Sequence, residues 1–152
     1  MLTGLGHIAF RVADLEKSRD FYCNKLGLRE VFRLERNNDP SHWLIYIQVA
    51  PGHFIELLPS VGTQEKENSS ERVVGFNHFC LLVDDLQATL HTFEARGLEL
   101  TDTPYFGLDR NWQYLLQDPD GNTIELLEIS PESPQAAADA SWSTTVEIPV
   151  EQ

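Results

Sequence analysis

The sequence predicts an α+β fold in which one βαβββ unit is used twice, because two marked strings recur in the same order. The string around His7 returns around His78, 78 − 7 = 71 positions later. The string around Glu56 returns around Glu125, 125 − 56 = 69 positions later. Two nearly equal offsets, each marked by the same ionisable residue, indicate an internal repeat.

The length of 152 residues is typical of one domain with its own hydrophobic core. Hydrophobic residues make up 41% of the chain and charged residues 23%, which is the balance of a globular protein. We expect a single domain over residues 1–130, made of a first repeat (residues 4–60) and a second repeat (residues 75–130). Residues 131–152 are rich in Pro, Ala and acidic residues and are expected to form a tail, with a short edge strand at Thr145–Ile148.

The first repeat begins with a strand and a helix. Strand alternation places His7, Ala9 and Arg11 on one face and apolar residues on the other. Asp14 is placed to cap a helix with an apolar stripe, which Gly27 ends. Strands are then expected at Arg29–Glu35, His42–Ala50 and His53–Leu58.

The second repeat follows the same plan. His78, Cys80 and Leu82 share one face of its first strand, and the helix that follows is capped by Asp85 and ended by Gly97. Strands are expected at Glu99–Thr103, Trp112–Gln117 and Asn122–Ile129, with loops at Ser60–Arg72 and Pro104–Asn111.

Turn residues at Asp118–Asn122 join the last two of these strands. Pro119 fixes φ for the first corner and Gly121 tolerates a positive φ, so a β-hairpin is expected. The outgoing strand carries Glu125 between apolar neighbours. Because burying a lone carboxylate is costly, we expect a positive group or a metal to meet it.

Charge and cysteine content limit the possible partners. Eleven Lys and Arg against 24 Asp and Glu give a net charge of −13, which disfavours nucleic acid as a partner. No apolar run approaches membrane-spanning length, so no membrane partner is expected. The absence of a leader pattern and the two cysteines, too few for a disulfide framework, favour a cytoplasmic protein.

Four residues on the helix-free face of the sheet form a candidate metal site. Taken singly, a strand histidine is more often a hydrogen-bonded core residue and a strand glutamate a solvated one. In register across a repeat, two imidazoles and two carboxylates suit one divalent transition metal and leave positions for water or substrate. The expected ligands are His7, Glu56, His78 and Glu125.

These segments resemble the vicinal oxygen chelate superfamily, the glyoxalase, bleomycin-resistance and dioxygenase group. The resemblance covers about residues 4–130 and rests on residues 7–15, 54–57, 77–85 and 118–128. It implies a cupped mixed sheet with helices on the outer face. It also implies one divalent metal (Ni, Zn, Co, Mn or Fe) on the same four ligands, and, as often in short two-unit chains of this group, a homodimer.

Within the superfamily, the ligand set is most similar to that of the lactoylglutathione lyases. This resemblance implies isomerisation of a hemithioacetal through an enediolate, with Glu125 as the base and Glu56 as its counterpart. It also implies a small substrate, anionic or glutathione-linked, bound by Arg11. Ser60 stands where these enzymes carry a glutathione-binding asparagine, so the thiol stays open. Arg110, in the second loop, is a further candidate for an anionic substrate tail.

Other members of the superfamily remain as alternatives. Methylmalonyl-CoA epimerases carry Gln where Glu56 stands. Extradiol dioxygenases use two histidines and one carboxylate, and thiol transferases of the fosfomycin-resistance type also have three protein ligands. A bleomycin-type binding protein has the fold without the metal, and four intact ligands disfavour that reading.

Overall fold

The structure is a computed structural model that describes residues 3–36, 39–60 and 74–142. The first repeat contains β1 (His7–Val12), α1 (Leu15–Arg19), η1 (Asp20–Lys25), β2 (Arg29–Arg36), β3 (Asp39–Ala50) and β4 (His53–Pro59). The second repeat contains β5 (His78–Leu82), α2 (Leu86–Ala95), β6 (Tyr105–Phe106), β7 (Trp112–Gln117) and β8 (Thr123–Glu128), and α3 (Pro134–Ala140) follows in the tail.

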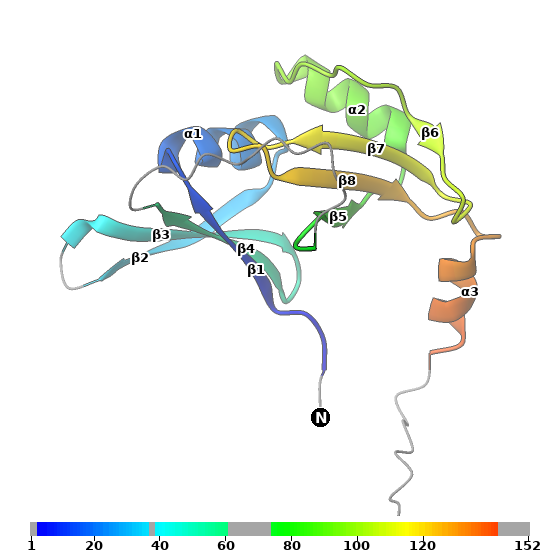
Figure 1. The fold of residues 1–152 in the computed structure, drawn as a ribbon, viewed down its shortest axis with the longest axis horizontal. Coiled ribbons are helices and arrows are strands. Elements are labelled where there is room, and N and C mark those ends of the chain that lie inside the picture. The colour runs from blue at the N-terminus through cyan, green and yellow to red at the C-terminus, as the bar shows by residue number, and fades with distance from the viewer. Residues whose placement is uncertain (1–2, 37–38, 61–73, 143–152) are drawn as a thin grey trace, which may run out of the picture.

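Each repeat forms its own four-stranded mixed sheet, with its helix packed on one side (Figure 1). The strand orders are β1-β4-β3-β2 and β5-β8-β7-β6. In both sheets the first strand pairs in parallel with the last, and the remaining neighbours are antiparallel. The predicted α+β fold with two βαβββ units is therefore confirmed.

The helix ends follow the predicted signals. The side chains of Asp14 and Asp85 each accept a hydrogen bond, at 2.9 Å, from the backbone N–H three residues later. Gly27 and Gly97 follow the helices with φ of 80° and 82°, a region that favours glycine. The first helix changes to a π-helix in η1, where the Leu26 N–H donates to a carbonyl five residues earlier at 3.0 Å.

One expected strand is wrong. Residues Glu99–Thr103 form no strand, and the edge of the second sheet is instead the two-residue β6, inside the expected loop Pro104–Asn111. The backbone N–H of Asp102 donates to the hydroxyl of Tyr114 at 3.3 Å, where a strand would use a carbonyl of its neighbour. The backbone of this segment thus bonds to a side chain of β7 and not to the β7 backbone at this position.

The two repeats share one hydrophobic core. Phe10 of β1 and Phe79 of β5 lie with ring centroids 5.2 Å apart, so the first strands of the two repeats meet inside it. The apolar faces of β3, β4, β7 and β8 supply most of the remaining buried side chains. These faces are the ones that strand alternation predicted for the helix-covered side.

The predicted hairpin between β7 and β8 fastens the second repeat to the first helix of the first repeat (Figure 1). Asp120 accepts hydrogen bonds from the backbone N–H of Ala13 at 3.0 Å and from the Ser18 hydroxyl at 3.3 Å. The Tyr22 hydroxyl donates to Asp118 at 2.9 Å. Gly121 has a φ of 74°, as the expected turn requires.

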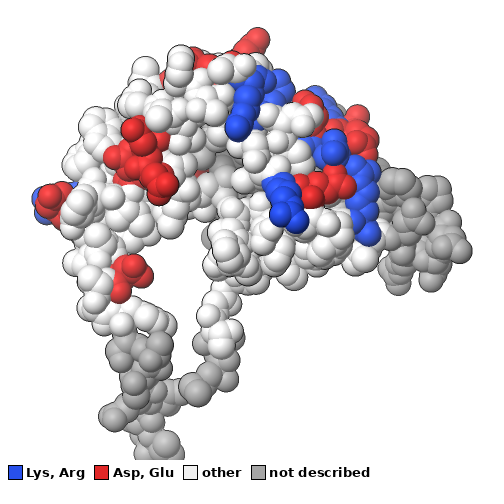
Figure 2. Space-filling model, turned by 180° about the vertical axis from the view of Figure 1, so that it is seen from behind, with Lys and Arg blue, Asp and Glu red and all other residues white. Residues whose placement is uncertain are grey.

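An ion network ties β2 to α1. Glu30 of β2 receives hydrogen bonds from Arg33 and Arg19, and Arg33 also pairs with Glu16 at 2.9 Å. The hydrogen bond from Arg33 is the largest cause that lowers the pKa of Glu30, to about 2. In Figure 2 the basic side chains on the rear face gather mainly over the first repeat, with acidic side chains among them.

A turn from Ser130 to Ser133 begins the tail, and hydrogen bonds to Asn111 hold the residues around it. Asn111 is fully buried, accepts a hydrogen bond from the Ser130 N–H at 2.9 Å and donates to Gln135 at 3.3 Å. Ser133 then caps α3, a helix that the sequence analysis did not predict. The expected strand Thr145–Ile148 lies outside the described residues.

Candidate functional site

The first repeat brings His7 and Glu56 together on its open face. In the parallel pairing of β1 with β4, Ala9 lies opposite Glu56, so His7 is a diagonal neighbour of the carboxylate. His7 Nε2 lies 3.4 Å from Glu56 Oε2. The side chain of His7 is 49% exposed and that of Glu56 is 14% exposed, so the imidazole is open to an incoming group.

The second repeat builds the same pair from the same register. Cys80 lies opposite Glu125 in the pairing of β5 with β8. His78 Nε2 lies 3.2 Å from Glu125 Oε2, and the two side chains are 38% and 14% exposed. The match between the two pairs extends from the residue types to their separation and exposure.

The outer ring nitrogen of His78 is already bound. Its Nδ1 lies 2.6 Å from the carboxamide oxygen of Asn77. In the tautomer that donates from Nδ1 to this oxygen, the lone pair of Nε2 is left for a metal. The sequence analysis missed Asn77 in this role, although it stands directly before the histidine.

The geometry of each pair fits two ligands of one ion. Two ligand atoms about 2.1 Å from a metal lie ~3.0–3.4 Å apart at angles near 90–110°. The two N–O separations of 3.4 and 3.2 Å agree with that range. A set of two imidazoles and two carboxylates is also a chemically suitable shell for a divalent transition metal.

Within one chain the four predicted ligands lie as two separate pairs. His7 and Glu56 belong to the first sheet, and His78 and Glu125 belong to the second. Among the described residues of the chain, no group of three or more His, Cys, Asp or Glu side chains is close enough to hold one ion. The fold therefore forms two separate His–Glu pairs, one on each sheet.

The two carboxylates have different neighbours. Tyr46 of β3 lies opposite Glu56, and burial, then the charge of Glu56 and hydrogen bonding to it, raise the pKa of the phenol. Cys80 lies opposite Glu125, and burial, followed by the charge of Glu125 and hydrogen bonding to it, raises the pKa of this thiol to about 12. Tyr46 was not singled out from the sequence, because its place beside Glu56 depends on the register of β3 with β4.

Arg11 lies on β1 and its guanidinium donates to the carbonyl oxygen of Pro59 at 3.2 Å. Within the described part of the chain, no carboxylate forms an ion pair with it. The Arg11 side chain is exposed. Its guanidinium carries five N–H donors, and the bond to Pro59 uses only one of them. The remaining donors are available to an anion.

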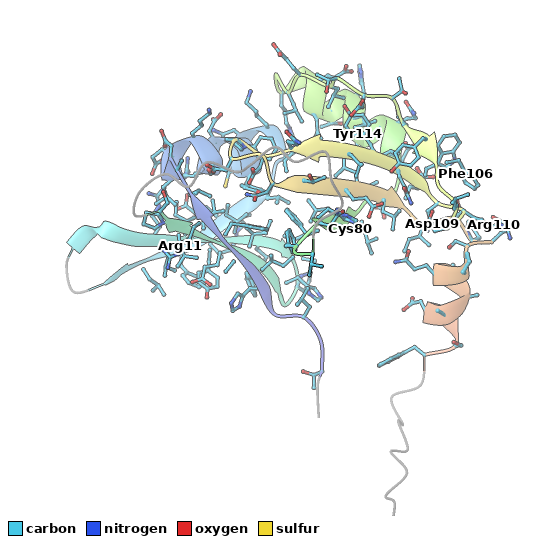
Figure 3. All side chains as sticks on the ribbon, viewed as in Figure 1. Arg11, Cys80, Phe106, Asp109, Arg110 and Tyr114 are labelled. Carbon is cyan, nitrogen blue, oxygen red and sulfur yellow. The ribbon has the colours of Figure 1, made fainter. Side chains whose placement is uncertain are left out.

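Of the other two candidate residues, Ser60 lies near Arg11 and Arg110 lies far from it. Ser60 follows β4, and its backbone N–H donates to the carbonyl of Val12 at 2.9 Å. Arg110 has a φ of 65° in the turn before β7 and is exposed. Figure 3 shows Arg11 on the first repeat and Arg110 at the outer end of the second, well separated.

A cavity of about 310 Å³ lies between the repeats, lined by residues of β1, β4 and β5. His7 of the first repeat and Cys80 of the second both line it, and most of the other lining residues are apolar. This volume is at the lower end of the range for small-molecule sites.

Comparison with known proteins identifies the family. The model of the Glyoxalase/Bleomycin resistance protein/Dioxygenase superfamily matches residues 4–126. The chain belongs to this superfamily. The match covers the first βαβββ unit and nearly all of the second, and its range includes the positions of the four predicted ligands.

Individual relatives of this superfamily member carry a lyase name. The lactoylglutathione lyase of Haemophilus influenzae is 30% identical over 127 residues, which cover 80% of this chain and 90% of the relative. The lactoylglutathione lyase of Schizosaccharomyces pombe is 28% identical over 152 residues, covering 87% of this chain and 49% of the relative. The chain thus spans about half the length of that relative, and 35% of the length of another from Arabidopsis thaliana.

Solved structures of the superfamily show the same fold. The trypanothione-dependent glyoxalase I of Leishmania major superposes with a TM-score of 0.65 at 23% identity, covering 91% of this chain and 95% of that one. A glyoxalase family protein of Enterococcus faecalis superposes with a TM-score of 0.70 at 18% identity, covering 82% of this chain and 97% of that one.

None of the helices in the described residues is both long and apolar enough to cross a membrane.

Proposed function

We propose that this chain is a divalent-metal-dependent lyase of the lactoylglutathione lyase type, acting on a small oxygenated substrate. The observation that carries the proposal is the repeated pair: His7 with Glu56 and His78 with Glu125, each at ligand spacing on an open sheet face. The lyase names of relatives near 30% identity support it. A non-enzymatic binding protein would not require these four side chains to keep matched geometry.

The metal would be held by the four pair residues and would supply Lewis acidity toward the substrate oxygens. Glu125 would remove the proton from the carbon that carries the hydroxyl and the sulfur and return it to the neighbouring carbonyl carbon, while the hydroxyl proton passes to the former carbonyl oxygen. This transfer isomerises a hemithioacetal to a thioester without an oxidant or a reductant. Glu56 is the counterpart of Glu125 in the first repeat.

The substrate that this site suits is small and partly anionic. Arg11 is the first candidate to bind an anionic group of the substrate. Its guanidinium uses one N–H in the bond to Pro59, and Arg11 lies on the same face of β1 as His7. Arg110 is a second candidate, at a distance that only an extended tail could reach. Ser60 lies at the end of β4, where a thiol-linked peptide would pass if the hemithioacetal is formed with glutathione.

A complete site requires two half-sites, and we propose that they meet between two copies of the chain. Each copy has one pair on each sheet, so a two-fold related dimer would place the first-repeat pair of one copy against the second-repeat pair of the other. Such a homodimer has two equivalent sites, each holding one divalent metal.

Metal analysis of protein purified without chelator tests the proposal directly. We expect about one divalent metal per chain, and its loss in His7→Ala and in His78→Ala. His91→Ala is the matched control, since His91 is exposed on α2. Turnover of methylglyoxal with glutathione, followed by thioester formation, then tests the reaction. Wild-type protein without metal after reconstitution would exclude the proposed enzyme.

A further inference from the structure

Tyr46 of β3 lies on the same open face of the first sheet as Glu56. Tyr46 lies directly opposite Glu56 in the antiparallel pairing of β3 with β4. Its ring stacks on Phe32 with centroids 4.4 Å apart, and it meets the ring of His7 edge-on at 5.9 Å. Tyr46 therefore contacts both members of the first His–Glu pair and is itself fixed by an aromatic neighbour.

The second repeat has no tyrosine at the matching position. The offset of 125 − 56 = 69 that relates the two glutamates takes position 46 to 115, which is Leu115. Leu115 lies opposite Glu125 in the pairing of β7 with β8, as Tyr46 lies opposite Glu56. The cross-strand neighbour of the carboxylate is thus a phenol in one half-site and an apolar side chain in the other.

The second carboxylate has a weaker donor on its other side. Cys80 lies opposite Glu125 on β5, at the position where β1 has Ala9 opposite Glu56. A thiol is a weak hydrogen-bond donor, whereas a phenol donates strongly to a carboxylate. Besides its histidine, each glutamate thus has one such neighbour on the adjacent strand, and the stronger donor of the two, the phenol, lies beside Glu56.

We propose that Tyr46 is a positioning residue, whose hydroxyl holds the Glu56 carboxylate beside His7 and so preforms the first half-site for metal. The inference rests on the metal site of the proposed function. An ordinary phenol is protonated at neutral pH and so remains a donor there.

The test is the affinity for divalent metal, measured by competition with a chromophoric chelator in Tyr46→Phe. This change keeps the ring on Phe32 and removes only the hydroxyl, so the melting temperature should stay within about 2 °C. Loss of a partner that orients a ligand typically weakens metal binding ~10–100-fold, and we expect at least the lower value. Tyr114→Phe is the matched control, because this phenol on β7 lies on the face away from Glu125 and accepts from the Asp102 N–H; its metal affinity should stay within about twofold of wild type.

Two further variants make the result specific. In a Glu56→Gln background, Tyr46→Phe should have a clearly smaller effect, because the two groups act together. Cys80→Ala should weaken metal binding less than Tyr46→Phe does. Affinity of Tyr46→Phe within twofold of wild type, or an equal loss in Cys80→Ala, would overturn the inference while leaving the proposed enzyme intact. A wild-type chain that binds no metal would instead overturn both.

Discussion

The hydroxyl of Tyr22 donates to Asp118 Oδ2 at 2.9 Å and joins residues 96 positions apart in the chain. Tyr22 is in the helix of the first repeat and Asp118 is in the hairpin of the second. Both side chains are buried, so this bond closes the junction between the repeats. Any site that depends on the relative placement of the two sheets depends on this junction.

Tyr22→Phe should therefore lower the free energy of unfolding by ~1.5–3 kcal/mol, the range for a hydrogen bond to a charged group. Asp118 keeps its bond from Asn122 Nδ2 at 2.7 Å, so the carboxylate is not left without partners. Urea unfolding monitored by fluorescence measures the change. Tyr105→Phe is the control and should change stability by less than ~0.5 kcal/mol. Equal effects of the two substitutions would show that the bond contributes nothing.

Glu30 gives a prediction for acid stability. Its hydrogen bond with Arg33 holds its pKa at about 2 in the folded chain, below the ordinary value of 4.5. A carboxyl with a lowered folded pKa contributes stability that is complete above pH 4.5 and is lost as the pH falls toward 2. The melting-temperature difference between wild type and Glu30→Gln should shrink across that window. A difference that does not vary with pH would argue against the ion network.

Glu125→Gln separates the base from the ligand. Glutamine keeps the shape and one oxygen donor, so much of the metal should stay bound. Removal of a general base typically lowers kcat by ~10²–10⁴-fold. Glu56→Gln is the symmetric comparison and should affect metal retention more than the proton transfer. Full turnover in Glu125→Gln would assign the base role to Glu56 or to a bound water.

Arg11→Ala tests the anionic substrate. The guanidinium has one backbone acceptor within the described residues, so its loss should leave the melting temperature nearly unchanged. If Arg11 binds the substrate, kcat/KM should fall by ~1.5–3 kcal/mol, about 10–100-fold, with metal content intact. Arg29→Ala, at an exposed arginine that begins β2, is the control. A fall in melting temperature with unchanged kinetics would make Arg11 structural.

The repeat and the face of each site residue could be predicted from the sequence. Strand alternation has a period of two, so the positions of His7 and Glu56 on their strands already placed both on one side of the sheet. The same rule placed His78 and Glu125. Cap residues such as Asp14 and Asp85 also marked the helix starts, because a cap is a local interaction.

Features that depend on strand register or on the distance between sheets could not be predicted. Tyr46 meets Glu56 only because β3 pairs with β4 in one particular register. Strand alternation shows which face of a sheet a side chain lies on, but it does not show how far apart two sheets are. It therefore did not reveal that the four predicted ligands form two separate pairs. The strand expected at Glu99–Thr103 is absent and β6 forms the edge instead; there the Asp102 N–H bonds to the Tyr114 hydroxyl, a contact that alternation does not predict.

The central claim is that one metal site is shared between two copies, and complementation tests it most directly. Chains carrying His7→Ala and chains carrying His78→Ala are co-expressed in equal amounts. If each site combines the first repeat of one copy with the second repeat of the other, half of the dimers are mixed and each has one intact site. Metal content and activity should then return to about 25% of wild type, although each variant alone has neither. Pairing His7→Ala with Glu56→Gln, two defects in the same repeat, should restore nothing. Failure of the first mixture to regain metal would contradict the shared site.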